Sequence, residues 1–152
     1  MAAKILRLLC VFFSVFTVWM CGCTPKSEEA PPPPGSFRAD FSAEYHGMRP
    51  AGTLTYLRQG VCTMQLTAPE TLAGLRVRFQ NSTLALQRGD AAATADEPYL
   101  PANSFPSAVF AALQAASNGS SDALELTAAG LPQLLRLPDG SAVTFLNAEA
   151  LD

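Results

Sequence analysis

Apolar and polar residues alternate along much of the chain after residue 36, and this pattern predicts a series of short β-strands. In residues 37–45, phenylalanine, alanine and tyrosine hold the odd positions, while charged and hydroxyl side chains hold the even ones. A period of two is typical of a strand with one buried and one solvated face. Further segments of this kind lie at residues 53–58, 61–68, 75–79 and 83–88. Because turn residues separate them at short intervals, they predict an antiparallel meander.

The rest of the chain predicts a helix and three more strands. Residues 89–103 show no alternation and contain breakers such as Gly89 and Pro98, so we predict an irregular connection there. Ser104 is a suitable N-cap for a helix over residues 105 to about 116, whose apolar side chains fall on one face. Further strands are predicted at residues 123–128, 134–137 and 142–147. This order indicates an α+β domain with about eight strands and a helix laid on the sheet.

The first 22 residues have the pattern of a secretory signal peptide. Lys4 and Arg7 form a positive start, and an almost unbroken apolar run follows over residues 8–20. A positive segment, an apolar segment of about 7–15 residues and a small residue at the cleavage site describe such a signal. The run is shorter than the roughly 20 residues that a permanent membrane helix needs. We therefore expect the mature chain to lie outside the cytoplasm.

The sequence Met20-Cys21-Gly22-Cys23 resembles the bacterial lipobox, in which a cysteine becomes the acylated first residue of the mature protein. Cys23 fits this position because small Gly22 precedes it, whereas bulky Met20 precedes Cys21. The resemblance implies diacylglycerol on the sulfur and often a further acyl chain, such as palmitate, on the amine. One acyl chain alone binds a membrane only marginally, so two or three imply stable anchoring at the extracytoplasmic face of the cell membrane. An ordinary signal peptide with a chance cysteine is the alternative.

After the signal, the chain divides into a tether and one domain. Residues 23–35 contain the cysteine, a polar segment and four consecutive prolines, which favour a stiff, extended spacer. Residues 36–152 are enough for one domain with its own core. Cleavage before Cys23 takes the formal net charge from −3 to about −5, and the remaining arginines are dispersed, which argues against a nucleic-acid partner. Cys62 is then the domain's single cysteine, so we expect it to be buried without a disulfide.

Several short motifs in residues 36–147 resemble the LolA/LolB-like lipoprotein carriers and their relatives in single-membrane bacteria. These motifs are Tyr45-His46-Gly47, Ala51-Gly52-Thr53-Leu54, Ala68-Pro69-Glu70-Thr71-Leu72-Ala73-Gly74-Leu75, Gly130-Leu131-Pro132 and Val143-Thr144-Phe145. The resemblance implies a curved, open antiparallel half-barrel with the helix packed on its concave face. It also implies that acyl chains of lipoproteins or lipids are held between helix and sheet. An anchored chain departs from the freely diffusing carriers of the family, and we match their functional arginine to no position here.

Catalytic and metal-binding patterns do not occur in the sequence. His46 is the single histidine, and Cys62 alone could join it within the domain, so a zinc site is not expected. No Gly-x-Ser-x-Gly elbow or nucleotide-binding glycine pattern is present. Asp96-Glu97 is an adjacent carboxylate pair of a kind that is usually solvated. We therefore expect no enzyme and no cofactor, and we interpret His46 as a surface turn residue.

Two functions remain open at this point. The first is a lipoprotein that binds an acyl chain or another apolar ligand between sheet and helix. Its candidate ligand-facing residues are large apolar side chains of the first three strands and the helix: Phe37, Phe41, Tyr45, Leu54, Tyr56, Met64, Leu66, Phe105, Val109 and Phe110. The second is a structural or interaction lipoprotein of the cell envelope, with a filled core, no ligand and an unidentified protein partner. A hollow beneath the helix favours the first function, and a filled interior with an exposed apolar patch favours the second.

Overall fold

The computed structural model describes residues 35–151, except 81, 97–99, 102 and 120–121. The predicted signal peptide, Cys23 and the tether up to residue 34 lie outside the described residues. None of the helices in the described part of the chain combines the length and the hydropathy of a membrane-spanning segment.

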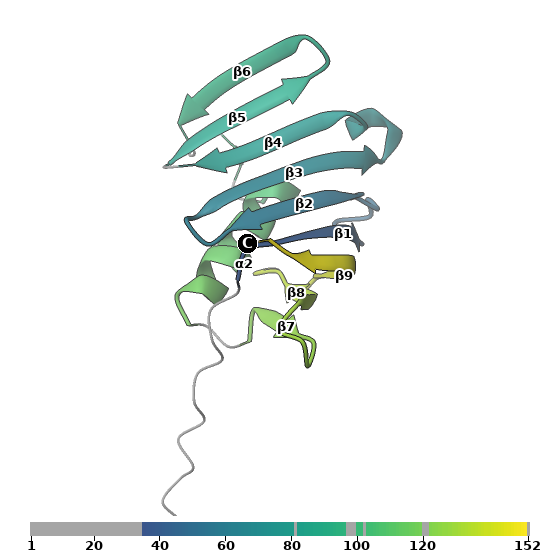
Figure 1. Ribbon diagram of the computed structural model, residues 1–152. Coiled ribbons are helices and arrows are strands. Elements are labelled where there is room, and N and C mark those ends of the chain that lie inside the picture. Colours follow the sequence, from purple (N-terminus) through teal and green to yellow (C-terminus); the bar gives the residue numbers. More distant parts are fainter. Residues whose placement is uncertain (1–34, 81, 97–99, 102, 120–121, 152) are drawn as a thin grey trace, which may run out of the picture.

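Nine strands form one antiparallel sheet in the order β6-β5-β4-β3-β2-β1-β9-β8-β7 (Figure 1). The first six follow one another as a meander: β1 (Phe37–Ala43), β2 (Ala51–Leu57), β3 (Val61–Ala68), β4 (Leu75–Gln80), β5 (Thr83–Arg88) and β6 (Ala91–Asp96). The last three add to the other side of β1: β7 (Leu124–Leu126), β8 (Pro132–Arg136) and β9 (Ala142–Ala150). Since β6 and β7 stand at opposite ends of this order, the sheet is not closed.

The helix α2 (Phe105–Ser117) lies between β6 and β7 in the chain and so connects the two edges of the sheet. Ser104 holds the N-cap position, and a proline follows in the first turn, where its missing N–H does no harm. The Ser104 hydroxyl donates to the Ser107 hydroxyl at 2.9 Å instead of capping a backbone amide. The predicted helix is therefore confirmed, with a different role for the Ser104 side chain.

The predicted strands are confirmed with one addition, since β6 lies in the segment that we expected to be irregular. The expectation of about eight strands was therefore wrong, and the sheet has nine. The β6 sequence is Ala-Ala-Ala-Thr-Ala-Asp, and the side chains from Ala91 to Thr94 are all exposed. A strand without a buried face shows no alternation of apolar and polar residues. It is held by pairing with β5, where Ala91 lies opposite Arg88.

Alternate side chains of the strands and one side of α2 belong to a single apolar cluster. Phe110 of α2 stacks on Phe79 of β4, with 4.3 Å between the ring centroids and an interplanar angle of 7°. At the end of α2, the hydroxyls of Ser117 and Tyr56 form a hydrogen bond. Among the described residues no polar or charged residue is fully buried, so apolar burial is the main stabilising term.

Candidate functional site

An apolar cavity of about 450 Å³ lies at the end of the sheet where α2 begins. Its walls come from the turn between β1 and β2, the end of β3, the short helix η1 (Glu70–Leu72), strands β4 and β5, and the segment leading into α2. Nine aliphatic, methionine, proline and phenylalanine side chains line it: Met48, Leu66, Leu72, Leu75, Val77, Leu86, Leu100, Phe105 and Pro106. Pockets of roughly 300–1,000 Å³ with mainly apolar walls are typical of small-molecule sites.

The apolar walls of this cavity are not completely covered by the rest of the protein. Leu72, Leu75, Leu86 and Leu100 are only partly buried, although each packs against the core. Leu66 and Val77, deeper in the sheet, are at most 1% exposed. The cavity therefore extends from a buried apolar floor to walls that a ligand could still cover.

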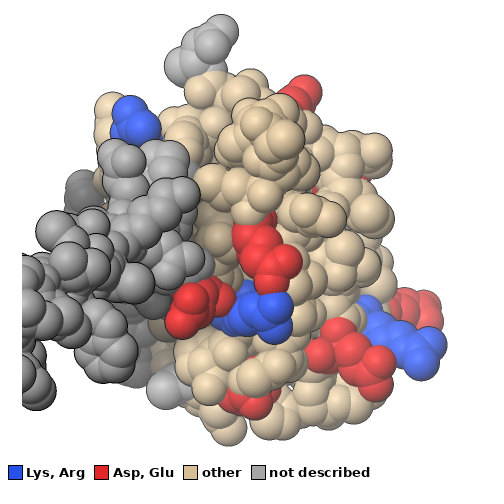
Figure 2. Space-filling view, turned by 90° about the horizontal axis from the view of Figure 1, so that it is seen from below, with Lys and Arg blue, Asp and Glu red and all other residues tan. Residues whose placement is uncertain are grey.

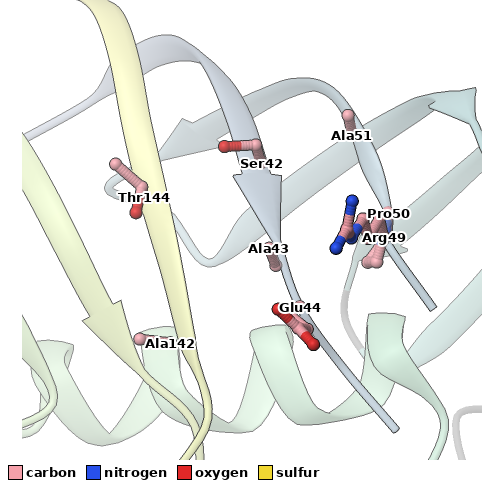
Figure 3. Close-up of a pocket in the computed structure, with 8 residues that line it drawn as sticks. All are labelled: Ser42, Ala43, Glu44, Arg49, Pro50, Ala51, Ala142 and Thr144. Carbon is pink, nitrogen blue, oxygen red and sulfur yellow. The ribbon is translucent and has the colours of Figure 1, made fainter. Parts of the chain in front are cut away.

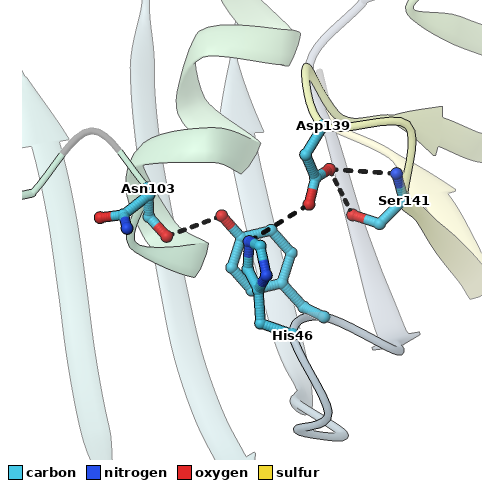
Figure 4. Close-up of polar contacts among 5 residues, drawn as sticks. His46, Asn103, Asp139 and Ser141 are labelled. Carbon is cyan, nitrogen blue, oxygen red and sulfur yellow. Dashed lines mark hydrogen bonds and ion pairs between the residues drawn. The ribbon is translucent and has the colours of Figure 1, made fainter.

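A network of polar contacts lies at the rim of the cavity (Figure 4). The Tyr45 hydroxyl donates to the carbonyl oxygen of Asn103 at 2.7 Å, which fastens the β1–β2 turn to the segment before α2. The His46 Nε2 atom lies 3.5 Å from Asp139 Oδ2, in the turn between β8 and β9. Because 58% of the His46 side chain and 32% of the Asp139 side chain are exposed, this ion pair is weak.

Hydrogen bonds shift the pKa of Asp139, and burial shifts the pKa of Tyr45. The hydroxyl and the backbone N–H of Ser141 both donate to Asp139, at 2.6 and 3.0 Å. These two bonds, followed by the nearby His46, hold the pKa of the Asp139 carboxyl below its ordinary value. Burial, followed by the negative charge of Asp139, raises the pKa of the Tyr45 hydroxyl. Asp139 therefore stays negative and Tyr45 stays neutral at physiological pH.

The ten residues predicted to face a ligand are all buried, but they do not all line the cavity. Three of them do, namely Tyr45, Leu66 and Phe105. The other seven pack within the apolar cluster away from it: Phe37, Phe41, Leu54, Tyr56, Met64, Val109 and Phe110. The sequence places Phe110 off the main apolar face of the helix, but in the structure Phe110 is buried and stacks on Phe79.

Several lining residues were not singled out from the sequence. Leu75 and Val77 alternate with arginines, and Leu86 lies two residues after Leu84, so the period of two that identified Leu66 could have found them. Leu72 and Leu100 lie in connections between strands and helix, where no periodic signal marks a wall residue. Cys23, the predicted lipidation site, lies outside the described residues.

A second hollow, of about 560 Å³, lies over the ends of β1, β2 and β9 (Figure 3). Small and polar side chains line it, among them Ser42 and Thr144, together with the opposite charges of Glu44 and Arg49. It has neither the apolar walls nor the covering helix that a hydrocarbon chain requires. We therefore place the candidate site in the first cavity.

In the described part of the chain, no hydroxyl or thiol is hydrogen-bonded to the histidine. The Ser141 hydroxyl donates to Asp139, and the His46 imidazole also faces Asp139, so the hydroxyl and the imidazole share a carboxylate and are not bonded to each other. Cys62 is 1% exposed, and burial raises the pKa of its thiol to about 12. Within the described ranges, no group of three His, Cys, Asp or Glu residues could hold a metal ion.

No protein-family model matches the chain, and a search of curated proteins finds no match. The resemblance to the LolA/LolB-like carriers therefore stays a prediction from the sequence.

Proposed function

We propose that this protein is a membrane-anchored extracytoplasmic lipoprotein that binds an acyl chain, or a ligand of similar shape, in the apolar cavity. The anchor is the lipid on Cys23, and the sheet acts as an open half-barrel with α2 on its concave face. The observation that carries the proposal is the cavity of about 450 Å³ walled by leucine, valine and phenylalanine side chains.

The chemistry of the cavity suits a hydrocarbon chain. Burial of each methylene group contributes roughly 0.8 kcal/mol, and the walls offer few polar partners that would hold ordered water instead. The partly buried leucines would lose their remaining solvent contact when a chain enters. His46 and Ser104 also line the cavity, and they provide polar atoms for the head of an amphipathic ligand at the rim.

One observation favours the alternative of a structural lipoprotein without a ligand. Seven of the ten residues predicted to face a ligand instead pack in a filled core. The space available to a ligand is therefore confined to the end of the sheet near η1 and the start of α2. Ligand uptake distinguishes the two functions, because a structural lipoprotein should take up none.

The test adds bulk to the cavity wall without changing the core. Leu86→Trp fills the space from a partly buried position, and Leu146→Trp makes the same change at a residue that is 51% exposed and does not line the cavity. The domain of residues 35–152, which lacks Cys23, is freed of any bound lipid. Binding of a fluorescent fatty acid and thermal stability are then measured for each variant. We expect Leu86→Trp to lose binding at unchanged stability and Leu146→Trp to bind like the wild type. A wild-type domain that is folded but binds no probe would overturn the ligand proposal and leave the structural alternative.

A separate experiment tests the anchor. Cys23→Ser should abolish incorporation of an acyl label in a bacterial host and release the protein from the membrane fraction, while Cys21→Ser should change neither. Labelling that is lost only in Cys21→Ser would place the lipid on the other cysteine.

A further inference from the structure

The face of the sheet opposite the apolar core carries a second candidate site. We call it the outer face and define it by the side chains of β1–β5 that alternate with the buried ones. Its central residues are hydroxyl, amide and guanidinium side chains: Arg38, Thr53, Thr55, Thr63, Gln65, Arg76 and Arg78. No aromatic side chain belongs to this set.

Strand pairing gathers arginines that are far apart in the sequence. Arg38 lies opposite Thr55, Thr55 opposite Thr63, and Thr63 opposite Arg78. Since neighbouring strands are about 4.8 Å apart, Arg38 and Arg78 stand at the two ends of a row about 14 Å long. Arg76 lies in the adjacent row, opposite Gln65.

The outer face is hollowed on both sides of β4. A depression of about 190 Å³ has Arg38 and Arg76 on its walls, and its floor is formed by Thr53, Thr55, Thr63 and Gln65. A second depression, of about 320 Å³, lies beside Arg78 and is lined by Gln80, Thr83 and Ala85. The two depressions together follow the face across five strands, from β1 to β5.

The positive charge of Arg76 and Arg78 is not balanced by acids in their own strand or in the strand on either side of it. Strands β2–β5 contain no Asp or Glu, although the whole chain has more acidic than basic residues. In the described part of the chain, Arg38, Arg76 and Arg78 take part in no ion pair. The Arg76 guanidinium donates to Gln65 Oε1 at 3.3 Å, which leaves most of its N–H groups free for a ligand.

Acidic residues occur in the strands at both ends of the face, with Asp40 in β1 and Glu149 in β9 at one end and Asp96 of β6, opposite Thr83, at the other. Asp40 accepts hydrogen bonds from Thr53 and from Asn147, each at 3.1 Å, and Glu149 lies opposite Arg38 in β9. Figure 2 shows a different side of the molecule, seen from below, on which acidic and basic side chains lie next to one another. At the β7 end of the sheet, Arg136 of β8 forms an ion pair with Glu125 of β7. The arginines of β4 thus stand apart from the mixed charges at the β7 end of the sheet.

We propose that the outer face binds an acidic polysaccharide. Its carboxylate or sulfate groups would pair with Arg76, Arg78 and Arg38, because guanidinium groups bind such oxyanions through parallel N–H bonds. Sugar hydroxyls would exchange hydrogen bonds with the threonine hydroxyls and the Gln65 amide on the floor. A floor without aromatic rings does not suit single-stranded nucleic acid, whose bases stack on such rings. The proposal concerns the opposite face from the apolar cavity and does not depend on acyl-chain binding.

The experiment uses the full-length protein in a nonionic detergent, with polygalacturonate and heparin as probes and a single-stranded oligonucleotide for comparison. The test variant is the double substitution Arg76→Gln and Arg78→Gln. The matched control is a second double substitution, Arg58→Gln and Arg88→Gln, which removes the same charge at a turn and at the end of β5. Arg88 donates to the Thr71 carbonyl oxygen and does not line either depression, so thermal stability is recorded for every variant.

We expect the wild type to bind at least one polysaccharide at low salt, and more tightly than the oligonucleotide. The test variant should bind about tenfold more weakly, and its slope of log affinity against log salt should fall by about two. The control variant should keep wild-type affinity within about twofold, as expected when screened charges lie away from the ligand. Equal losses in both variants, tighter binding of the oligonucleotide, or no polysaccharide binding by the folded wild type would each overturn the proposal.

Discussion

Gly52→Ala tests the tightest contact between two strands of the sheet. Gly52 lies in β2 opposite Leu66 of β3, next to a register shift between Ala51 and Gly52. A Cβ atom at this position would lie 2.0 Å from the Gln65 carbonyl oxygen, 2.9 Å from the Gln65 carbonyl carbon and 3.0 Å from the Leu66 Cα atom. All three atoms belong to the backbone, so no side-chain rotation can relieve the overlap.

The expected loss of stability comes from two opposing effects. Replacing glycine by alanine usually stabilises a protein by about 0.4–1 kcal/mol where the site accepts it, because the unfolded chain loses freedom. Overpacking a tightly packed site is destabilising by about 1–3 kcal/mol, and a backbone obstacle places this site at the upper end. We therefore expect the free energy of unfolding to fall by about 2 kcal/mol. For a domain of this size, the Tm should fall by about 6–10 °C.

We would measure this loss of stability by thermal and urea denaturation. The proteins compared are the wild type, Gly52→Ala and the control Gly35→Ala. A Cβ atom on Gly35 would meet nothing within 4 Å, so this control should melt like the wild type. Leu66 lines the cavity, and a shift of its backbone should also weaken fatty-acid binding by Gly52→Ala. A Tm equal to or above that of the wild type would show that the strands are not this close and would refute the argument.

The remaining predictions concern a buried thiol, a ring stack and an acid. Cys62 should not react with a thiol reagent at about pH 8 in the folded protein, because burial raises the pKa of its thiol to about 12; reaction as fast as in the urea-unfolded chain would contradict this. Phe110→Ala should lower the free energy of unfolding by about 3–5 kcal/mol in urea denaturation, because the ring stacks on Phe79 in the core, and a change near zero would show that the ring is not part of the packing. Asp139 has a lowered pKa, so its contribution to stability is present above the unfolded pKa and is lost as the pH falls through the folded value. Ser141→Ala removes the side-chain hydrogen bond that contributes most to the lowered Asp139 pKa, so NMR titration of this variant should show a higher Asp139 pKa. An unchanged value would mean that the hydrogen bond is not formed in solution.

The two proposals assign different ligands to the two faces of one sheet. Side chains alternate along a strand, so a change in the outer-face arginines leaves the cavity walls untouched, and a change in Leu86 leaves the arginines in place. Each binding activity can therefore be removed without the other. This separation makes the failure of one proposal independent of the failure of the other.

The sequence by itself determined most of the local structure of this protein. The alternation in β1–β5 and the capped apolar pattern of α2 are visible within a few residues, because burial of one face requires a fixed period in each element. The burial of Cys62 follows from the same alternation in β3. The edge strand β6 escaped this reasoning, since it is held by backbone pairing and its exposed alanines carry no pattern.

Only the tertiary structure decided which apolar side chains fill the core and which surround a cavity. Phe41 and Leu66 have the same apolar character on neighbouring parts of the sheet, yet Leu66 lines the cavity and Phe41 packs in the filled interior. The difference depends on how side chains from distant segments, such as Leu72 and Leu100, fill the available volume, and this is not encoded in local periodicity. Strand order likewise brings Arg38 near the arginines of β4, although about 40 residues separate them in the sequence. Both candidate sites therefore arise from contacts between segments that are distant in the chain.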